Sequence, residues 1–265
     1  MIKIAIFNQK GGVGKTTMTV NLASCLSERW NKKVLVVDAD AQCNSSKYLL
    51  ATGEELSSKV NTIYDLLQKD KATILPITFQ NGRGKIKTKI SLLQGDKRVD
   101  FLNTKQVNTL KEKLLPYEDD YDFCFFDCSA QKTTINLLAL GACDYILVPV
   151  ITDVDSINGF DMAIELCNSY RSSMQNTTIS ILGIVVNDVS TTGSIDNYLI
   201  NKFGEDFQNV IFKSTIRHST LLKQARFFGL PINYYKKSSN VTLDYYACAL
   251  EIMERASVAS GKVGK

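Results

Sequence analysis

The chain has 265 residues, of which 45% are hydrophobic and 22% charged, and its net charge at pH 7 is +4; this composition is typical of a globular protein that folds without disulfides or structural metals. No run approaches the roughly 18 apolar residues of a membrane span, and the N-terminus enters an apolar run at once, so we expect neither a transmembrane segment nor a signal peptide. Seven scattered cysteines without a Cys-x-x-Cys pair and a single histidine favour reduced thiols in the cytoplasm and argue against a zinc cluster.

Short runs rich in valine, isoleucine and phenylalanine alternate with longer segments that have one apolar face, which predicts strands buried on both sides and helices that cover them. In chain order we predict a strand at 2–7, a helix at 18–30, a strand at 33–38, a helix at 61–70, a hairpin within 76–98, a helix at 103–115, a strand at 121–127, a helix at 133–140, a strand at 144–150, a helix at 156–170, a strand at 179–186, a helix at 195–203, a strand at 209–213, and helices at 221–228 and 241–256. The alternation predicts an α/β fold with one doubly wound, mostly parallel sheet and helices on both faces, formed as a single domain by residues 1–265.

A glycine-rich segment, residues 8–17, joins the first predicted strand to the first predicted helix. Strand, glycine-rich turn and helix is the context of a phosphate-binding loop, because glycines let the backbone approach a phosphate and the N–H groups then face the anion. Lys15 would reach the terminal phosphates of a nucleotide, and the Thr16 hydroxyl would bind Mg²⁺. The predicted nucleotide-binding residues are Gly11, Gly12, Val13, Gly14, Lys15, Thr16 and Thr17.

Three further strands end in polar side chains, and ligands of open α/β sheets bind beyond the carboxyl ends of the strands. Asp38 and Asp40 are two residues apart, so extended backbone would direct both to the same side, where one carboxylate would serve magnesium and the other would activate water. Asp127 ends a phenylalanine-rich strand, as in a Walker B motif that binds magnesium. Asn187 ends a later strand; its amide offers a donor and an acceptor to a base, or it starts a turn.

The pattern Lys-Gly-Gly-x-Gly-Lys-Thr at residues 10–16 resembles the deviant Walker A motif of the ParA/MinD family of ATPases, and the resemblance runs from residue 2 to about residue 250. It implies a SIMIBI-like P-loop NTPase fold, ATP and Mg²⁺ as cofactors, and an ATP-dependent homodimer. In the family the first lysine of this motif reaches the nucleotide of the other subunit, which would give Lys10 a catalytic role beside Lys15.

The resemblance also implies roles for the residues at the strand ends. Asp40 would orient the attacking water, Asp38 and Asp127 would hold the metal with Thr16, and Asn187 would contact adenine. The chain departs from the family pattern at Ala41, which replaces a proline, and at residues 129–131, where Ser-Ala-Gln stands in place of the family's prolines.

The segment 216–232 resembles the C-terminal region through which ParA proteins bind DNA non-specifically. The resemblance implies phosphate contacts by Arg217, Lys223 and Arg226, the last two on one helix face, with a solvated charged face as the alternative. It further implies a cytoplasmic, nucleoid-associated partition ATPase that a ParB-like centromere-binding protein stimulates. The sequence leaves no room before residue 2 for a helix-turn-helix domain, so we do not expect operator binding.

A MinD-like ATPase that cycles on membranes is the main alternative, but it needs a C-terminal amphipathic helix with bulky apolar anchors. The tail at 256–265 has no aromatic residue, so we expect no stable membrane association. An iron–sulfur reductase, a tyrosine autokinase and a DNA-binding scaffold with negligible ATP turnover are further alternatives. We interpret the basic stretch at 83–89 as a solvated hairpin, with phosphate contact as the alternative.

Overall fold

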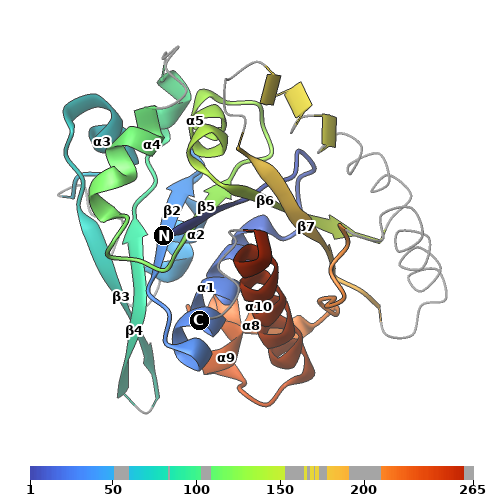
Figure 1. Ribbon diagram of the computed structural model, residues 1–265. Coiled ribbons are helices and arrows are strands. Elements are labelled where there is room, and N and C mark those ends of the chain that lie inside the picture. The colour runs from blue at the N-terminus through green and yellow to red at the C-terminus, as the bar shows by residue number, and fades with distance from the viewer. Residues whose placement is uncertain are drawn as a thin grey trace.

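A computed structural model describes residues 1–50, 60–82, 84–102, 109–152, 164–165, 168–169, 171–172, 178–190 and 210–259 of the chain. Strands and helices alternate along it, as the sequence predicts (Figure 1). The elements are β1 (Ile2–Ile6), α1 (Lys15–Trp30), β2 (Val34–Ala39), α2 (Asn44–Leu49), α3 (Ile63–Lys69), β3 (Ile74–Asn81), β4 (Gly84–Leu93), the 3₁₀ turns η1 (Lys97–Phe101) and η2 (Leu115–Tyr117), α4 (Thr109–Leu114), β5 (Phe123–Cys128), α5 (Thr134–Ala142), β6 (Tyr145–Ile151), β7 (Ser180–Asn187), α8 (Thr220–Phe227), α9 (Ile232–Tyr235) and α10 (Asn240–Ala259).

Seven strands form one sheet in the order β3-β4-β2-β5-β1-β6-β7. Every neighbouring pair is parallel except β3 and β4, which form an antiparallel hairpin at one edge. All residues of β2 and β5 are buried, because helices cover both faces of the sheet and each face of a central strand needs apolar side chains. The predicted doubly wound, mostly parallel sheet is therefore confirmed.

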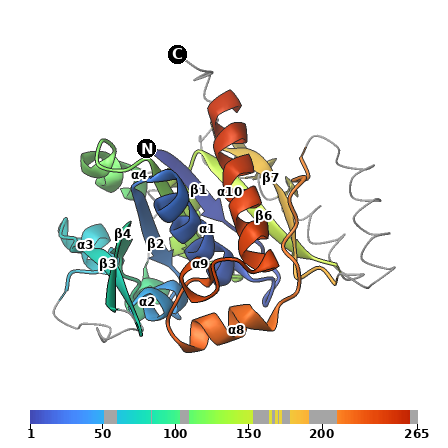
Figure 2. The same ribbon diagram turned by 90° about the horizontal axis from the view of Figure 1, so that it is seen from below.

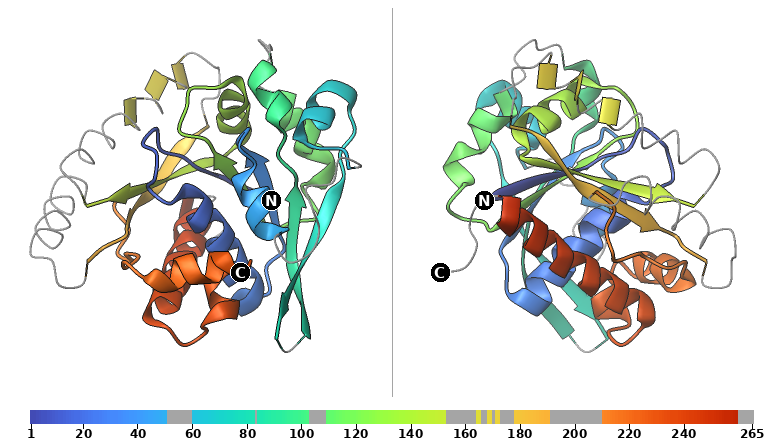
Figure 3. Two further views of the ribbon diagram at one scale, coloured as in Figure 1. Left: turned by 180° about the vertical axis from the view of Figure 1, so that it is seen from behind. Right: turned by 45° about the vertical axis from the view of Figure 1, so that its right-hand side comes forward.

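Two helical layers enclose the sheet. One apolar core unites one face of the sheet with α1, α2, α8, α9 and α10, and the other unites the opposite face with α3, α4 and α5. Figure 2, seen from below, shows α1 and α10 crossing the first face, and the two views in Figure 3 show the hairpin of β3 and β4 at the edge.

Parallel pairing places the carboxyl ends of β1, β2 and β5 side by side. Ile6 pairs with Asp127 across β1 and β5, and Asp38 pairs with Asp127 across β2 and β5. The glycine-rich segment follows β1 directly, so it lies at the same edge as both carboxylates. This edge is where a bound ligand is expected in an open α/β sheet.

The predicted helix at 61–70 is confirmed as α3, and Thr62 caps it. Asp65 accepts a hydrogen bond from the Thr62 backbone N–H, so the two residues form a capping box. Lys69 and Arg98 also bind the Asp65 carboxylate, each at 3.0 Å. Burial alone would raise the pKa of Asp65, but the hydrogen bonds from Lys69, Thr62 and Arg98 lower it to about 2.

The predicted strand at 209–213 is wrong in its described part, where Ile211 forms only an isolated bridge with Ile184. Glu251 explains the interruption, because its carboxylate accepts the backbone N–H groups of Lys213 and Ser214 at 3.0 Å each, so these groups do not pair with β7. The predicted helix at 103–115 is described from residue 109 and gives way to a 3₁₀ turn at Leu115.

Other predictions fall beyond the described residues. The predicted helix at 195–203 and most of that at 156–170 lie outside them. Within the described part of the chain six cysteines are buried and free, in agreement with reduced thiols. A search of the same residues finds no helix with the length and apolar character needed to cross a membrane.

Candidate active site

The glycine-rich segment forms a compact loop around the Lys15 ammonium. Gly12 and Gly14 have φ angles of 79° and 90°, in the left-handed region that glycine adopts without strain. The Lys15 amine donates hydrogen bonds to the carbonyls of Asn8 (2.8 Å) and Lys10 (3.0 Å). Burial lowers the pKa of Lys15, and the charge of nearby carboxylates opposes that shift. The loop therefore holds a buried cation on weak acceptors that a phosphate could replace.

Asn8 shapes this loop, although the sequence analysis gave it no role. Its amide nitrogen donates to the Pro149 carbonyl at the end of β6 (2.8 Å), and its amide oxygen accepts the Lys10 backbone N–H (2.8 Å). An asparagine directly after a strand is a common turn residue, so its position alone did not distinguish it.

Thr16 and Asp127 meet as predicted. The Thr16 hydroxyl donates to Asp127 Oδ2 at 2.9 Å. Asp38, also fully buried, accepts the backbone N–H and the hydroxyl of Ser46 at 2.8 and 2.6 Å. Burial raises the pKa of Asp127 and the charge of Asp38 raises it further, whereas the bond from Thr16 lowers it. Burial likewise raises the pKa of Asp38, against the lowering by Ser46.

These residues fit a divalent cation that is shared with a nucleotide. Two buried carboxylates that are neighbours in the sheet repel each other, and a cation beside them would relieve that repulsion. Among the described residues no cluster of three His, Cys, Asp or Glu side chains could hold a metal by itself. Mg²⁺ commonly binds through one hydroxyl or carboxylate, water and substrate phosphates, which is the set that Thr16, Asp38 and Asp127 can complete.

Asp40 lies differently from the sequence-based expectation. β2 ends at Ala39, and the chain turns there, so Asp38 and Asp40 do not share one side of an extended strand. The Asp40 N–H donates to Asp38 Oδ1 (3.2 Å), and its own carboxylate accepts from the Gln42 N–H (2.9 Å) and the Asn44 amide (3.2 Å). The half-buried Asp40 carboxylate thus faces the turn before α2, while Asp38 stays inside.

Comparison with known proteins places this site in a family. The profile of a family described as AAA domain matches residues 1–181. The chromosome-partitioning ATPase Soj of Treponema pallidum is 30% identical over 96% of this chain and 98% of its own length. The chain belongs to the ParA/MinD family of P-loop ATPases. The sporulation initiation inhibitor protein Soj of Bacillus subtilis is 29% identical over 94% of this chain and 97% of its own length.

Solved structures share the fold of this family member. Apo McdA of Cyanothece superposes with a TM-score of 0.80 at 22% identity, covering 96% of this chain and 99% of its own. The septum site-determining protein MinD of Pyrococcus horikoshii, solved with Mg-ADP, has a TM-score of 0.72 at 21% identity, covering 98% and 99%. At these identities the similarity shows a common fold.

The segment that departs from the family's prolines is held by hydrogen bonds instead. The buried Asn136 amide donates to the carbonyls of Ser129 (3.0 Å) and Gln131 (2.6 Å), and its oxygen accepts the Ser129 N–H (3.2 Å). Proline fixes a turn by its ring; here one asparagine on α5 fixes the turn after Asp127. Asn136 lies within an apolar helical pattern, so the sequence alone did not indicate this role.

Two residues with roles implied by the resemblance contact the phosphate loop. The Asn187 amide nitrogen donates to the Val13 carbonyl (2.8 Å), and a Cβ added at Gly14 would overlap it. The Lys10 backbone N–H donates to the Asn8 amide oxygen, and the Lys10 carbonyl accepts from the Lys15 amine; Lys10 itself is half-buried. Contact of Asn187 with adenine and action of Lys10 across a dimer stay predictions.

The three residues predicted to bind DNA lie in unlike surroundings. Arg217 forms a two-point ion pair with Asp244, at 2.6 and 2.8 Å. Lys223 and Arg226 are exposed on α8, and the Arg226 guanidinium lies 5.7 Å from the Tyr48 ring of α2. Since Ser46 of the same α2 binds Asp38, α2 touches both the acids and the helix predicted to bind DNA.

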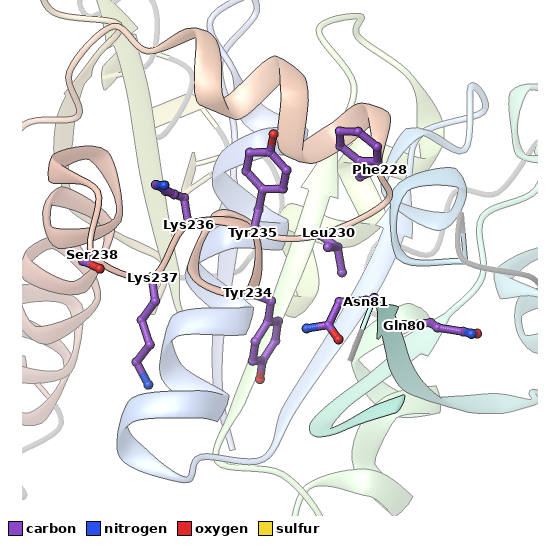
Figure 4. A pocket seen from close by; sticks show the side chains of 10 residues that line it. Gln80, Asn81, Phe228, Leu230, Tyr234, Tyr235, Lys236, Lys237 and Ser238 are labelled. Atoms are coloured by element: carbon purple, nitrogen blue, oxygen red, sulfur yellow. The ribbon is translucent and has the colours of Figure 1, made fainter. Parts of the chain in front are cut away.

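A cavity of about 820 Å³ opens between the tip of the β3–β4 hairpin and the segment that links α8 to α10. Figure 4 shows Phe228, Leu230 and Tyr234 on one side and Asn81 on the other. None of the motif residues of the phosphate loop or of the acid turns lines it, so it is separate from the candidate active site.

Proposed function

We propose that this protein is a ParA-like partition ATPase of the cytoplasm that binds ATP and Mg²⁺, dimerises, and then binds DNA without sequence specificity. The observation that carries the proposal is the convergence of the phosphate loop with Thr16, Asp38 and Asp127 at one edge of the sheet. Two relatives that match nearly the whole chain, one named a chromosome-partitioning ATPase and one a chromosome partitioning protein, support the same function.

In this proposal each group of the site has one task. Lys15 leaves the Asn8 and Lys10 carbonyls for the phosphates, and Thr16 with Asp38 and Asp127 holds the magnesium. The metal, when bound, neutralises charge on the phosphates. Asp40 orients the attacking water, which its half-buried position at the turn after β2 permits.

Dimerisation and stimulation complete the proposed cycle. Lys10 contributes to the nucleotide site of a second copy, so hydrolysis is slow until the dimer forms and a ParB-like protein binds it. DNA binding by exposed basic residues of α8 then depends on ATP, because α2 connects that helix with the acid turn.

Sedimentation with ATP–Mg²⁺ tests this proposal directly. Wild-type protein is mixed with duplex DNA or with vesicles of anionic phospholipid, and a Lys15→Ala variant serves as the control that cannot use ATP. We expect ATP-dependent sedimentation with DNA and none with vesicles. ATP-dependent sedimentation with vesicles alone would replace the proposal by the MinD-like alternative, and equal binding by the Lys15→Ala variant would remove ATP control from it.

A further inference from the structure

The hairpin of β3 and β4 extends beyond the rest of the sheet as an arm. β2 pairs with β4 only from Ile90 to Leu93, so residues 84–87 pair with β3 alone, and the β3–β4 register shifts between Lys87 and Ser91. Figure 1 shows this arm reaching past the neighbouring strands. Because β4 runs parallel to β2, the tip of the arm lies at the edge of the sheet opposite to Asp38 and the phosphate loop.

One face of the arm is fixed to the body of the protein. Ile77 and Phe79 are 2% and 1% exposed, and the Phe79 ring lies 5.6 Å from that of Tyr234 in α9. The Lys89 backbone N–H donates to the Ser27 hydroxyl of α1 (2.9 Å). An isolated two-stranded hairpin is marginal in water, so these contacts keep the arm in place.

The other face is a row of lysines. Lys85, Lys87 and Lys89 alternate along β4 and are all exposed. Regular strand spacing puts Lys85 and Lys87 about 6.6–6.8 Å apart on one side of the strand, and Lys89 follows where the register against β3 shifts. Opposite Lys85 and Lys87 on β3 lie the uncharged Gln80 and Thr78. Figure 4 shows Gln80 extending away from Tyr234 while Asn81 turns toward it, in keeping with two faces of opposite character.

Among the residues that the structure describes, no acid balances this row. Between Asp70 and Asp96 the sequence holds five lysines or arginines and no aspartate or glutamate. Within the described part of the chain, the salt bridges and hydrogen bonds give no carboxylate partner to the side chains of Lys85, Lys87 or Lys89. Like charges in a row reduce stability, so an uncompensated row on a fixed arm favours an anionic partner.

We propose that the lysine face of the arm, Lys85, Lys87 and Lys89, is a contact surface for the phosphate backbone of duplex DNA, additional to α8. A row of exposed cations along one strand suits a linear polyanion. An anionic membrane is the less suitable partner, because the face offers no bulky apolar side chain to enter a bilayer. The choice of DNA rests on the proposed function; the anionic character of the partner rests on the arm itself.

The test compares two triple variants that change the net charge equally. Lys85→Gln/Lys87→Gln/Lys89→Gln removes the lysine face, and Lys33→Gln/Lys97→Gln/Lys213→Gln removes three exposed lysines on other parts of the chain. Binding of ATP-loaded protein to a short fluorescent DNA duplex is measured from 50 to 200 mM NaCl. ATP affinity and thermal unfolding are measured for both variants, since the arm lies at the edge away from the nucleotide site.

For the arm variant we expect DNA affinity about tenfold lower at 50 mM NaCl, and a salt slope reduced by roughly 2.7, which is about 0.9 for each of three lost phosphate contacts. The matched variant keeps the larger part of the wild-type slope, and ATP affinity and unfolding stay unchanged in both. Equal effects of the two variants would overturn the inference, because only net charge would then matter. So would an arm variant that binds DNA normally but aggregates, since lysines on an edge strand also block strand pairing.

Binding to vesicles of anionic phospholipid tests whether the lysine face contacts lipid headgroup phosphates instead of DNA phosphates. If the arm variant loses vesicle binding and retains duplex binding, the surface belongs to a membrane and the inference is wrong. If wild-type protein binds no DNA at any salt concentration, the DNA-binding part of the proposed function is wrong. If wild-type protein binds DNA and the arm variant has the same salt slope, only the inference about the arm is wrong.

Discussion

The closest fit in the phosphate loop is between Gly14 and Asn187, and Gly14→Ala tests it. Gly14 has φ of 90°, and the Asn187 amide occupies the place of an added Cβ. Alanine in this region costs about 1–3 kcal/mol. Moving Asn187 aside breaks its 2.8 Å hydrogen bond to the Val13 carbonyl, which adds about 0.5–1.5 kcal/mol. We expect a total loss of about 1.5–4.5 kcal/mol, from the strain and the lost bond together.

Two measurements show whether this free energy is lost from the stability of the protein or from its affinity for ATP. If the loop keeps its shape, the free energy of unfolding falls, as urea denaturation of the protein without nucleotide would show. If the loop relaxes instead, titration calorimetry with ATP–Mg²⁺ shows the loss as a dissociation constant about 10 to 2000 times higher. Gly11→Ala is the matched control, because its added Cβ meets nothing within 4 Å; its free energy of unfolding should change by less than about 1 kcal/mol.

The double variant Gly14→Ala/Asn187→Ala separates the two causes. Without the Asn187 side chain the overlap disappears and only the backbone strain remains, so the Gly14→Ala change should cost about 1 kcal/mol less in the Asn187→Ala background. A Gly14→Ala protein within about 0.5 kcal/mol of wild type in both measurements would refute the reasoning. If the double variant is as stable as Asn187→Ala alone, the positive φ of residue 14 costs alanine no free energy.

Four other expectations follow from the site and its surroundings. Lys15→Ala should weaken ATP binding by more than about 100-fold in calorimetry, since Lys15 carries the ammonium that the loop encloses. Asp40→Ala should bind ATP normally, hydrolyse little of it, and accumulate as a dimer in gel filtration. Asp244→Asn frees the Arg217 guanidinium, so DNA affinity rises if Arg217 contacts phosphate and falls if the ion pair only shapes the surface; Arg217→Gln is the comparison. Asp65 has a pKa lowered to about 2, so its contribution to stability is complete above about pH 4 and is lost as pH falls through 2. Urea denaturation of wild type and Asp65→Asn should therefore differ at pH 6 and converge near pH 2.

Local patterns predicted most of the regular elements. The valine-rich run before Asp38 and the phenylalanine-rich run before Asp127 are buried on both faces, which is why periodicity located β2 and β5 within one or two residues. The strand expected at 209–213 failed because the backbone N–H groups of Lys213 and Ser214 bind Glu251, a residue 38 and 37 positions away from them. No local pattern carries that information.

In the candidate site, too, some residues could be located from the sequence and others only from the fold. The sequence by itself determined the phosphate loop, since glycines before a lysine and a threonine satisfy a local backbone requirement, and it located Asp38 and Asp127 at strand ends. Only the tertiary structure decided that Asp38 and Asp127 are direct neighbours, that Ser46 and Asn136 hold the turns beside them, and that Asp40 turns away.

The basic residues show most clearly what cannot be predicted from the sequence. As sequence, Arg217 and the lysines at 85, 87 and 89 are equally charged, and Arg217 is one of the three residues predicted to bind DNA. In the folded chain Arg217 is paired with Asp244, while the three lysines form one exposed row without a described carboxylate partner. Charge is written in the sequence, but whether it is neutralised depends on which distant carboxylate the fold brings within about 3 Å.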